Sequence, residues 1–432
     1  MLPECRTGSD VYSIPKYALE ARDVDGFMEE LKGFHQEFSD CFSRQEPREN
    51  FFRYMVGQFS QLERKSIEPI ALQVEGAKVR AMQFFVSDAL WDEEKIRSKY
   101  RRLVKEDLGD ETGVLIFDET SFVKKGNDSA GVARQYCGTL GKVENCQVGV
   151  FAAYASRHGY CLLDGRLFVP EKWFTAEYDT RRIKCRFPSD LSFKSKPQLA
   201  AEMLREISGD SVLPFRYVVA DTVYGCSPEF IHTVEEITGV SYFVSIPKDT
   251  LCWLTMPMVI IKEYRYKGKV RRKKLLGEPG DAPLSFDTIA RNTNSYFWYR
   301  RKVSEGTKGP IEYEFTRRRV ILSRDGLPGK EVWLVIRRTI GTIGSEPVYS
   351  FFISNAPLST RLKTFVWLSG IRWAIEQCFE ETKTELGMDH YELRKLPGWV
   401  HHMLTCILAH FFLWHIKLRL GEKSTSYYSI AA

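Results

Sequence analysis

The chain of 432 residues lacks most of the signals that mark secreted, zinc-binding or membrane-spanning proteins. Its ten cysteines form no C-x-x-C pair and follow no regular spacing, which argues against a disulfide framework and against a zinc site. The opening MLPECRTGSD has no basic-then-apolar signal-peptide layout, so we expect reduced thiols and a cytoplasmic location. The longest apolar stretch, residues 404–413, contains His410 and is shorter than the roughly 20 residues that cross a bilayer. It predicts a buried helix and no membrane partner.

Strong charge and low complexity are also missing. The apolar fraction of 44% and the charged fraction of 27% are those of an ordinary globular protein. The net charge of +6 is modest for this length, so any affinity for a polyanion depends on where basic residues cluster. The length exceeds what one hydrophobic core usually serves, and therefore predicts two or three domains.

The hydrophobic period changes along the chain and predicts an α/β (mixed) fold. Residues 23–102 have a helical period, as in Phe27, Leu31 and Phe34. After Gly113, short apolar runs predict strands, and further helices and strands then alternate, which implies a mixed sheet with helices on its faces. The expected strands are 114–117, 148–155, 160–169, 216–221 and 241–246, and the expected helices are 197–207 and 228–237. Residues 248–349 alternate with a period of two and predict a β-rich insertion, followed by helices over 361–386 and about 398–420.

Three carboxylates occupy positions of different kinds. Asp118 and Asp221 each follow an apolar run and are expected at strand ends, whereas Glu376 lies inside a helical pattern. A cluster of such oxygen ligands favours magnesium or manganese over zinc. Two ions roughly 3.5 to 4 Å apart activate a hydroxyl and stabilise a leaving oxygen on phosphorus. Singly, the two aspartates are also explained as turn caps, and the glutamate as a solvated surface residue.

Two basic residues share a helix face with Glu376. At 100° per residue, Arg372, Glu376 and Lys383 fall within about 40° of one another, beside an apolar stripe. We expect Arg372 and Lys383 to contact phosphate or to stabilise charge in a transition state. The alternative is an ion pair between Arg372 and Glu376 that only orders the helix.

These residues resemble the motifs of the DDE transposases, most closely the IS701 group of the IS4-like set. The first motif is Asp118 with the following KKGNDSAGVARQYCGTLGKVENCQVGVFAAYAS, and the second is Asp221 with Tyr224 and Gly225. The third is Arg372, Glu376 and Lys383, continued by GMDHYELR; Ser369 stands where the family motif has tyrosine. The resemblance covers roughly residues 110–415.

The resemblance implies an RNase H-like catalytic domain in a cut-and-paste transposase. Asp118, Asp221 and Glu376 would hold two Mg²⁺ (or Mn²⁺), with Arg372 and Lys383 as further catalytic residues. The partners would be double-stranded DNA, as transposon terminal inverted repeats and target, bound by a dimer in a bacterial cytoplasm at the nucleoid. The expected domains are a helical N-terminal DNA-binding region (1–110), the catalytic domain (111–247), the β-rich insertion (248–350), and the final catalytic helix with a helical C-terminus (351–432).

Basic and aromatic residues supply candidates for DNA contact. Cations that follow Asp118 in a Gly-rich loop are expected to grip phosphates, although a solvated hairpin explains them too. The densest basic run, residues 262–274, has eight Lys or Arg and one Glu. An aromatic, Trp253 or Trp298, would stack on a flipped base as in related enzymes, or be a core residue. The DNA-contact candidates are Lys124, Lys125, Arg134, Lys142, Tyr224, Trp253, Arg271, Arg272, Lys273 and Lys274.

Other functions are weighed against this one. His401, His402 and His410 are poorly spaced for a metal site and are expected in the core or an interface. A domesticated, non-cleaving DNA-binding regulator would share the fold, but it would have no need of three intact acids. A two-carboxylate glycosidase would have no need of the basic insertion.

Overall fold

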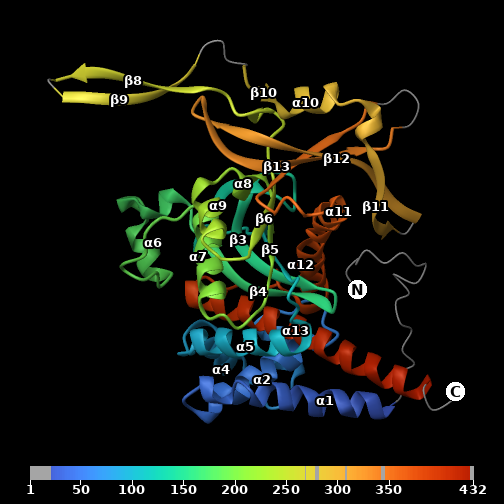
Figure 1. Cartoon of the computed structure of the whole chain (residues 1–432). Coiled ribbons are helices and arrows are strands. Elements are labelled where there is room, and N and C mark those ends of the chain that lie inside the picture. Colours follow the sequence, from blue (N-terminus) through green and yellow to red (C-terminus); the bar gives the residue numbers. More distant parts are fainter. Residues whose placement is uncertain (1–20, 268, 278–281, 307–308, 342–345, 429–432) are drawn as a thin grey trace. The chain divides into compact units, whose positions relative to one another are not determined.

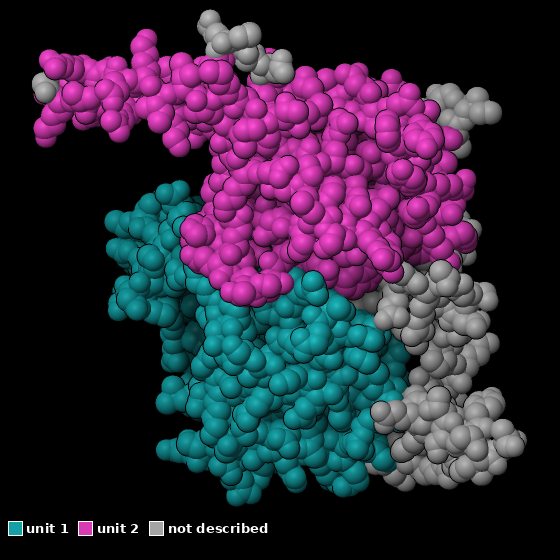
Figure 2. Space-filling view, viewed as in Figure 1, with its two compact units in different colours: residues 1–2, 12–216, 372–432 teal, residues 3–11, 217–371 magenta. Residues whose placement is uncertain are grey.

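The computed structural model describes residues 21–428 except 268, 278–281, 307–308 and 342–345 (Figure 1). The chain forms two compact units, coloured separately in Figure 2. Among the described residues, unit 1 combines the chain up to Arg216 with the chain from Arg372 onward, and unit 2 is Tyr217–Ile371. The domain ranges expected from the sequence stay a prediction.

The first part of unit 1 is helical, as the hydrophobic period predicted. Aromatic rings pack among these helices and against α13 (Leu396–Tyr428). Phe34 of α1 lies 5.2 Å from Phe412 of α13, and Phe42 lies 5.2 Å from Phe51 of α2, centroid to centroid. Asp92 caps α5 by accepting a hydrogen bond from the backbone N–H of Lys95. The helices are α1 (Ala21–Gln36), α2 (Gln45–Phe59), α3 (Ile67–Gln73), α4 (Val79–Ser87) and α5 (Glu93–Leu108).

Four antiparallel strands form the sheet of unit 1. β3 (Lys142–Ser156) lies in the middle and pairs with β1 (Val114–Val123), β2 (Ala133–Cys137) and β4 (Gly159–Phe168). The three predicted strands are present, and β2 is additional. The expectation that Asp118 ends its strand is wrong, because β1 continues to pair with β3 as far as Val123 opposite Cys146.

The remaining α-helices of unit 1 are α6 (Asp179–Lys184), α7 (Lys196–Gly209), α12 (Trp373–Leu386) and α13. Of these, α7, α12 and α13 pack on strands of the sheet. α13 contacts β4 and α12, as well as α1, α2, α4 and α5. Its segment Leu396–Arg419 is long and apolar enough to cross a membrane, but 78% of its most apolar window is buried. The predicted buried helix over 404–413 is therefore confirmed.

Unit 2 contains a mixed sheet. β5 (Tyr217–Ala220) runs parallel to β6 (Ser241–Ser245), as two strands joined by a helical crossover do. The other pairs are antiparallel, in the order β6, β14 (Tyr349–Ser354), β13 (Leu327–Thr339), β12 (Gly309–Arg324), β7 (Leu251–Trp253) and β10 (Leu284–Ser285), with β11 (Tyr299–Gly306) also on β12. Its helices are α8 (Thr222–Gly225), α9 (Pro228–Glu235), α10 (Phe286–Asn292) and α11 (Leu362–Ile371).

The predicted mixed α/β class is confirmed, and the β-rich character of 248–349 is present as strands β7 to β13. The strand β14 joins these strands to β6, so the β-rich segment extends the sheet of its own unit. The single helix expected over 361–386 is instead two, α11 and α12, which meet at Arg372.

Candidate active site

Asp118 lies inside β1 with its carboxylate largely covered. The side chain is 14% exposed, and the residue is paired with Phe151 of β3. Its Oδ1 accepts a hydrogen bond from the backbone N–H of Glu119 at 2.8 Å. Its Oδ2 accepts one from Nη1 of Arg372 at 2.7 Å. The buried strand β1 thus holds the carboxylate of Asp118 in a defined position.

Arg372 joins Asp118 to Glu376. It precedes the first turn of α12, and its Nη2 lies 2.5 Å from Oε1 of Glu376, one turn further along. The planar guanidinium of Arg372 therefore forms both ion pairs at once, one with Glu376 in the same helix and one with Asp118 of β1. Arg372 and Asp118 are 254 positions apart in the chain. Two of the three predicted metal ligands, Asp118 and Glu376, are therefore paired with the same arginine side chain.

Lys383 also reaches β1. Its Nζ donates a hydrogen bond to Oγ1 of Thr120 at 2.7 Å and to the carbonyl of Ser121 at 3.3 Å. Burial lowers the pKa of Lys383 from its usual value. The helix face predicted for Arg372, Glu376 and Lys383 therefore does turn toward the strand of Asp118. Their catalytic roles stay a prediction.

Asp221 belongs to unit 2. It directly follows β5 and caps the short helix α8, where its Oδ1 accepts a hydrogen bond from the backbone N–H of Val223 at 2.9 Å. The turn-capping interpretation of this residue is confirmed, which leaves its role as a ligand a prediction. Within the part of the chain that is described, no three His, Cys, Asp or Glu side chains are grouped as a metal site.

The donor set itself fits a hard divalent cation. Asp118 and Glu376 present carboxylate oxygens to one positive group, and carboxylates are the ligands that magnesium and manganese prefer. The Glu376 side chain is 48% exposed, so it is accessible from solvent.

The basic residues after Asp118 are in three different settings. Nζ of Lys124 donates to the carbonyl of Tyr391 at 2.9 Å and lies 3.4 Å from the centroid of its ring. Burial lowers the pKa of Lys124 to about 8. Lys125 is exposed. Arg134 and Lys142 belong to β2 and β3, so the expected loop is in part a β-hairpin, because the two strands pair from Ala133 opposite Cys146 onward.

The aromatic candidates of unit 2 are buried. Tyr224 is fully covered and its ring lies 5.6 Å from that of Phe230. Trp253 is 3% exposed and pairs with Ile321 between β7 and β12. Trp298 is 7% exposed, with the guanidinium of Arg338 at 4.0 Å from its ring. The core interpretation of both tryptophans is confirmed, and base stacking stays a prediction.

The three histidines are core residues, as expected. All are buried. His402 Nδ1 is 2.7 Å from the hydroxyl of Tyr54, and His410 Nε2 is 2.8 Å from Oε2 of Glu381. Each of these contacts gives one ring nitrogen of a buried histidine a hydrogen-bonding partner within the protein.

Thr120 is the residue that the sequence interpretation missed. It holds the ammonium of Lys383 two positions after Asp118. The DETS run was visible in the sequence, but only the strand's alternation shows which of its side chains reach α12.

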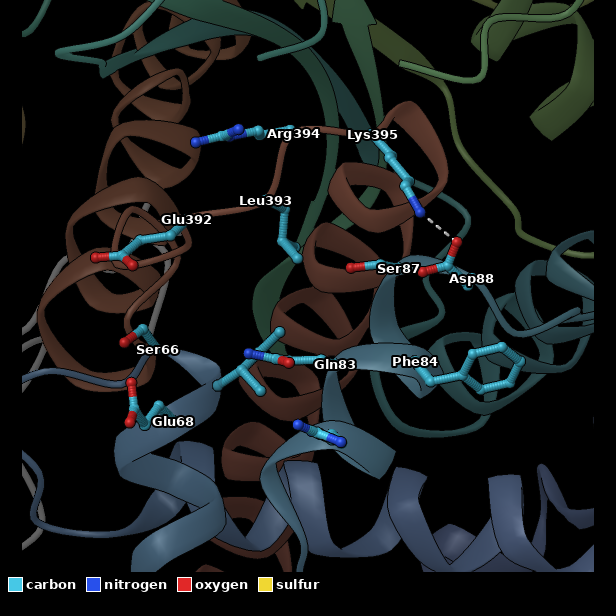
Figure 3. A pocket seen from close by; sticks show the side chains of 12 residues that line it. Ser66, Glu68, Gln83, Phe84, Ser87, Asp88, Glu392, Leu393, Arg394 and Lys395 are labelled. Atoms are coloured by element: carbon cyan, nitrogen blue, oxygen red, sulfur yellow. Dashed lines mark hydrogen bonds and ion pairs between the residues drawn. The ribbon is translucent and has the colours of Figure 1, made fainter. Parts of the chain in front are cut away.

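A cavity of about 620 Å³ lies elsewhere in unit 1 (Figure 3). It lies between helices α3 and α4 and residues 392–395, and none of the predicted site residues lines it. Its charges are balanced, and Lys395 is paired with Asp88 across part of it. The cavity therefore shows no preference for an anion.

The chain has relatives of known type. The model of the DDE superfamily endonuclease family matches residues 37–310. The chain is 24% identical over 361 residues to the probable transposase for insertion sequence element IS701 of Microchaete diplosiphon, covering 82% of this chain and 80% of that protein. It is also similar to a piggyBac transposase in a synaptic complex with hairpin DNA, with a TM-score of 0.39, 10% identity and coverage of 90% of this chain and 72% of that one. Because the family model spans more than half of its length, the chain belongs to the DDE superfamily endonucleases and is an enzyme of the nuclease and transposase type.

Proposed function

We propose that this enzyme is a cut-and-paste transposase, which cleaves DNA at transposon ends and joins the released 3′-hydroxyl to target DNA. The observation that carries the proposal is the meeting of Asp118 and Glu376 on the guanidinium of Arg372. Membership of the endonuclease family and similarity to the IS701 transposase support it.

Asp118, Asp221 and Glu376 would hold two Mg²⁺ (or Mn²⁺). When bound, such ions activate the attacking oxygen and stabilise the leaving oxygen of a phosphodiester. Arg372 keeps Asp118 and Glu376 beside each other, and its guanidinium has five N–H donors in all, enough to orient a phosphate as well. Lys383 adds a second positive group, which Thr120 holds near the same strand.

The substrate would be double-stranded DNA, as terminal inverted repeats and as target. Paired ends require two active sites, so we propose a dimer on DNA in the bacterial cytoplasm, with the helical N-terminal region also binding DNA. A hairpin intermediate on the second strand is compatible with this scheme. The basic segments of unit 2 provide the positive charge that a polyanion requires.

The test is the substitution Glu376→Gln, with Glu380→Gln as its control. Both change one exposed carboxylate of α12 to an amide, but only Glu376 contacts Arg372. With Mg²⁺ and the DNA that flanks its own gene, Glu376→Gln should lose cleavage by on the order of 100-fold or more, since even outer-sphere partners of a metal are worth 10- to 100-fold.

DNA binding by gel shift should be retained in both variants, and Glu380→Gln should cleave normally. Unchanged nicking by Glu376→Gln would refute the assignment of this residue. Binding without any cleavage by the native protein would instead favour the regulator.

A further inference from the structure

A two-stranded hairpin forms a separate sheet in unit 2. Its strands are β8 (Val259–Tyr266) and β9 (Lys269–Leu276). Every residue of β8 is exposed, as are Lys269–Lys274 of β9. The hairpin extends from the rest of its unit as an arm (Figures 1 and 2). An isolated hairpin is marginally stable in water, so a surface of this kind is expected to gain order from a partner.

The pairing register gives the arm two different faces. Residues directly opposite each other lie on the same face, and successive residues alternate between faces. The pairs Lys262↔Lys273, Tyr264↔Arg271 and Tyr266↔Lys269 therefore share one face, which we call the cationic face. The pairs Ile261↔Lys274, Glu263↔Arg272 and Arg265↔Val270 make up the opposite, mixed face.

The charges of the two faces differ in kind. The cationic face has four Lys or Arg residues and no acid along these three pairs. On the mixed face, Nε of Arg272 lies 2.7 Å from Oε1 of Glu263, which occupies that guanidinium and lowers the net charge. The mixed face also contains two exposed apolar residues, Ile261 (61% exposed) and Val270 (58% exposed), which separate its basic side chains. A polyanion therefore meets more uncompensated charge on the cationic face.

Two tyrosines complete the cationic face. Tyr264 is 44% exposed and Tyr266 is 50% exposed. The guanidinium of Arg271 lies 5.2 Å from the ring of Tyr266, within the range of a cation–π interaction. Phenolic hydroxyls and basic side chains are among the groups that contact phosphate and sugar in protein–DNA interfaces.

We propose that the arm lies on duplex DNA through its cationic face alone, with Lys262, Lys269, Arg271 and Lys273 on phosphates and the mixed face turned away. This inference rests on the proposed function, since it takes DNA as the substrate. A two-stranded ribbon has dimensions that a major groove admits. Among the candidates expected from the sequence, Arg271 and Lys273 contact DNA, whereas Arg272 and Lys274 do not.

The experiment compares Arg271→Ala/Lys273→Ala with Arg272→Ala/Lys274→Ala in the full chain. The two double variants remove the same residue types from adjacent positions of β9, so they match in charge and in location. Binding to a fluorescent duplex is measured by anisotropy over a series of KCl concentrations, with EDTA present to prevent cleavage. Each phosphate contact adds about 0.9 to the slope of log K against log salt.

The cationic-face variant should lose about 1.8 from the slope and bind less tightly at every salt concentration, whereas the mixed-face variant keeps the native slope. Equal losses in both variants would overturn the assignment of one face, and no loss in either would remove the arm from the DNA interface. Neither result touches the Mg²⁺-dependent cleavage and its loss in Glu376→Gln, on which the proposed function stands. Unchanged melting temperatures confirm that both variants fold.

Discussion

The buried ion pair between Arg97 and Asp164 provides a sharp test of how unit 1 is held together. Arg97 is on α5, Asp164 is on β4, and their side chains are 8% and 3% exposed. Nε of Arg97 lies 3.0 Å from Oδ1 of Asp164, and Nη2 of Arg166 lies 3.0 Å from Oδ2. The pair therefore fastens the helical segment to the central sheet.

The substitution Asp164→Asn removes the negative charge while nearly keeping the shape. It leaves Arg97 buried, with Glu93 as a partner at 3.4 Å. Breaking a buried pair by removing one partner costs about 3–5 kcal/mol. Because Glu93 remains, we expect about 3 kcal/mol, at the lower end of that range. Glu206→Gln, which removes a 42% exposed partner of Arg166, should cost less than about 1 kcal/mol.

The measurement is the free energy of unfolding by urea as a function of pH. Burial opposes ionisation of Asp164, but Arg166 and Arg97 outweigh it and lower its pKa. The stabilisation is therefore present above the unfolded pKa of about 3.9 and is lost as the pH falls through the lower folded pKa.

The difference in unfolding free energy between the native protein and Asp164→Asn should stay constant near neutral pH and should shrink as the solution becomes acidic. A loss below about 1 kcal/mol, the range of exposed pairs, or a difference that persists at low pH, would refute the reasoning.

Two further predictions concern single residues of unit 1. Burial lowers the pKa of Lys124 to about 8, so this residue should make native stability rise between that pH and the unfolded value of about 10.4. Because burial also lowers the pKa of Lys383, Lys124→Met should reduce this rise, without abolishing it, in urea titrations at stepped pH. Gly387 ends α12 at φ +68, and a Cβ there would lie 2.7 Å from Cβ of Lys65. Gly387→Ala should therefore destabilise the protein by about 1–2 kcal/mol in thermal unfolding. The control Gly26→Ala, whose added Cβ meets nothing within 4 Å, should not destabilise it. Equal effects of the two substitutions would contradict the strain argument.

Local patterns predicted most of the secondary structure. The helices predicted within residues 23–102, the apolar runs that became β1, β3 and β4, and the β-rich character of 248–349 are present among the described residues. These succeeded because each element buries one face, and burial imposes a period on the sequence. The order of three motifs likewise indicated the family.

The errors came from interactions between distant segments. The apolar run before Asp118 suggested that its strand ended there, but pairing with β3 extends β1 to Val123. Around Arg134 and Lys142, the hairpin that the sequence left open as the alternative to a loop forms because β2 pairs with β3. The sequence also does not show which basic residues are free to bind a polyanion. In the structure, Lys124 packs on Tyr391 and Arg272 is paired with Glu263.

The amino-acid sequence by itself determined the mixed α/β class, the family and the acids to consider, because periodicity and motif order are properties of the chain. Only the tertiary structure decided that Arg372 joins Asp118 to Glu376, that Thr120 holds Lys383, and which face of the β8–β9 arm is uncompensated. The physical reason is that charge acts through distance in space, and distance in space is set by strand register and helix packing between segments far apart in the chain.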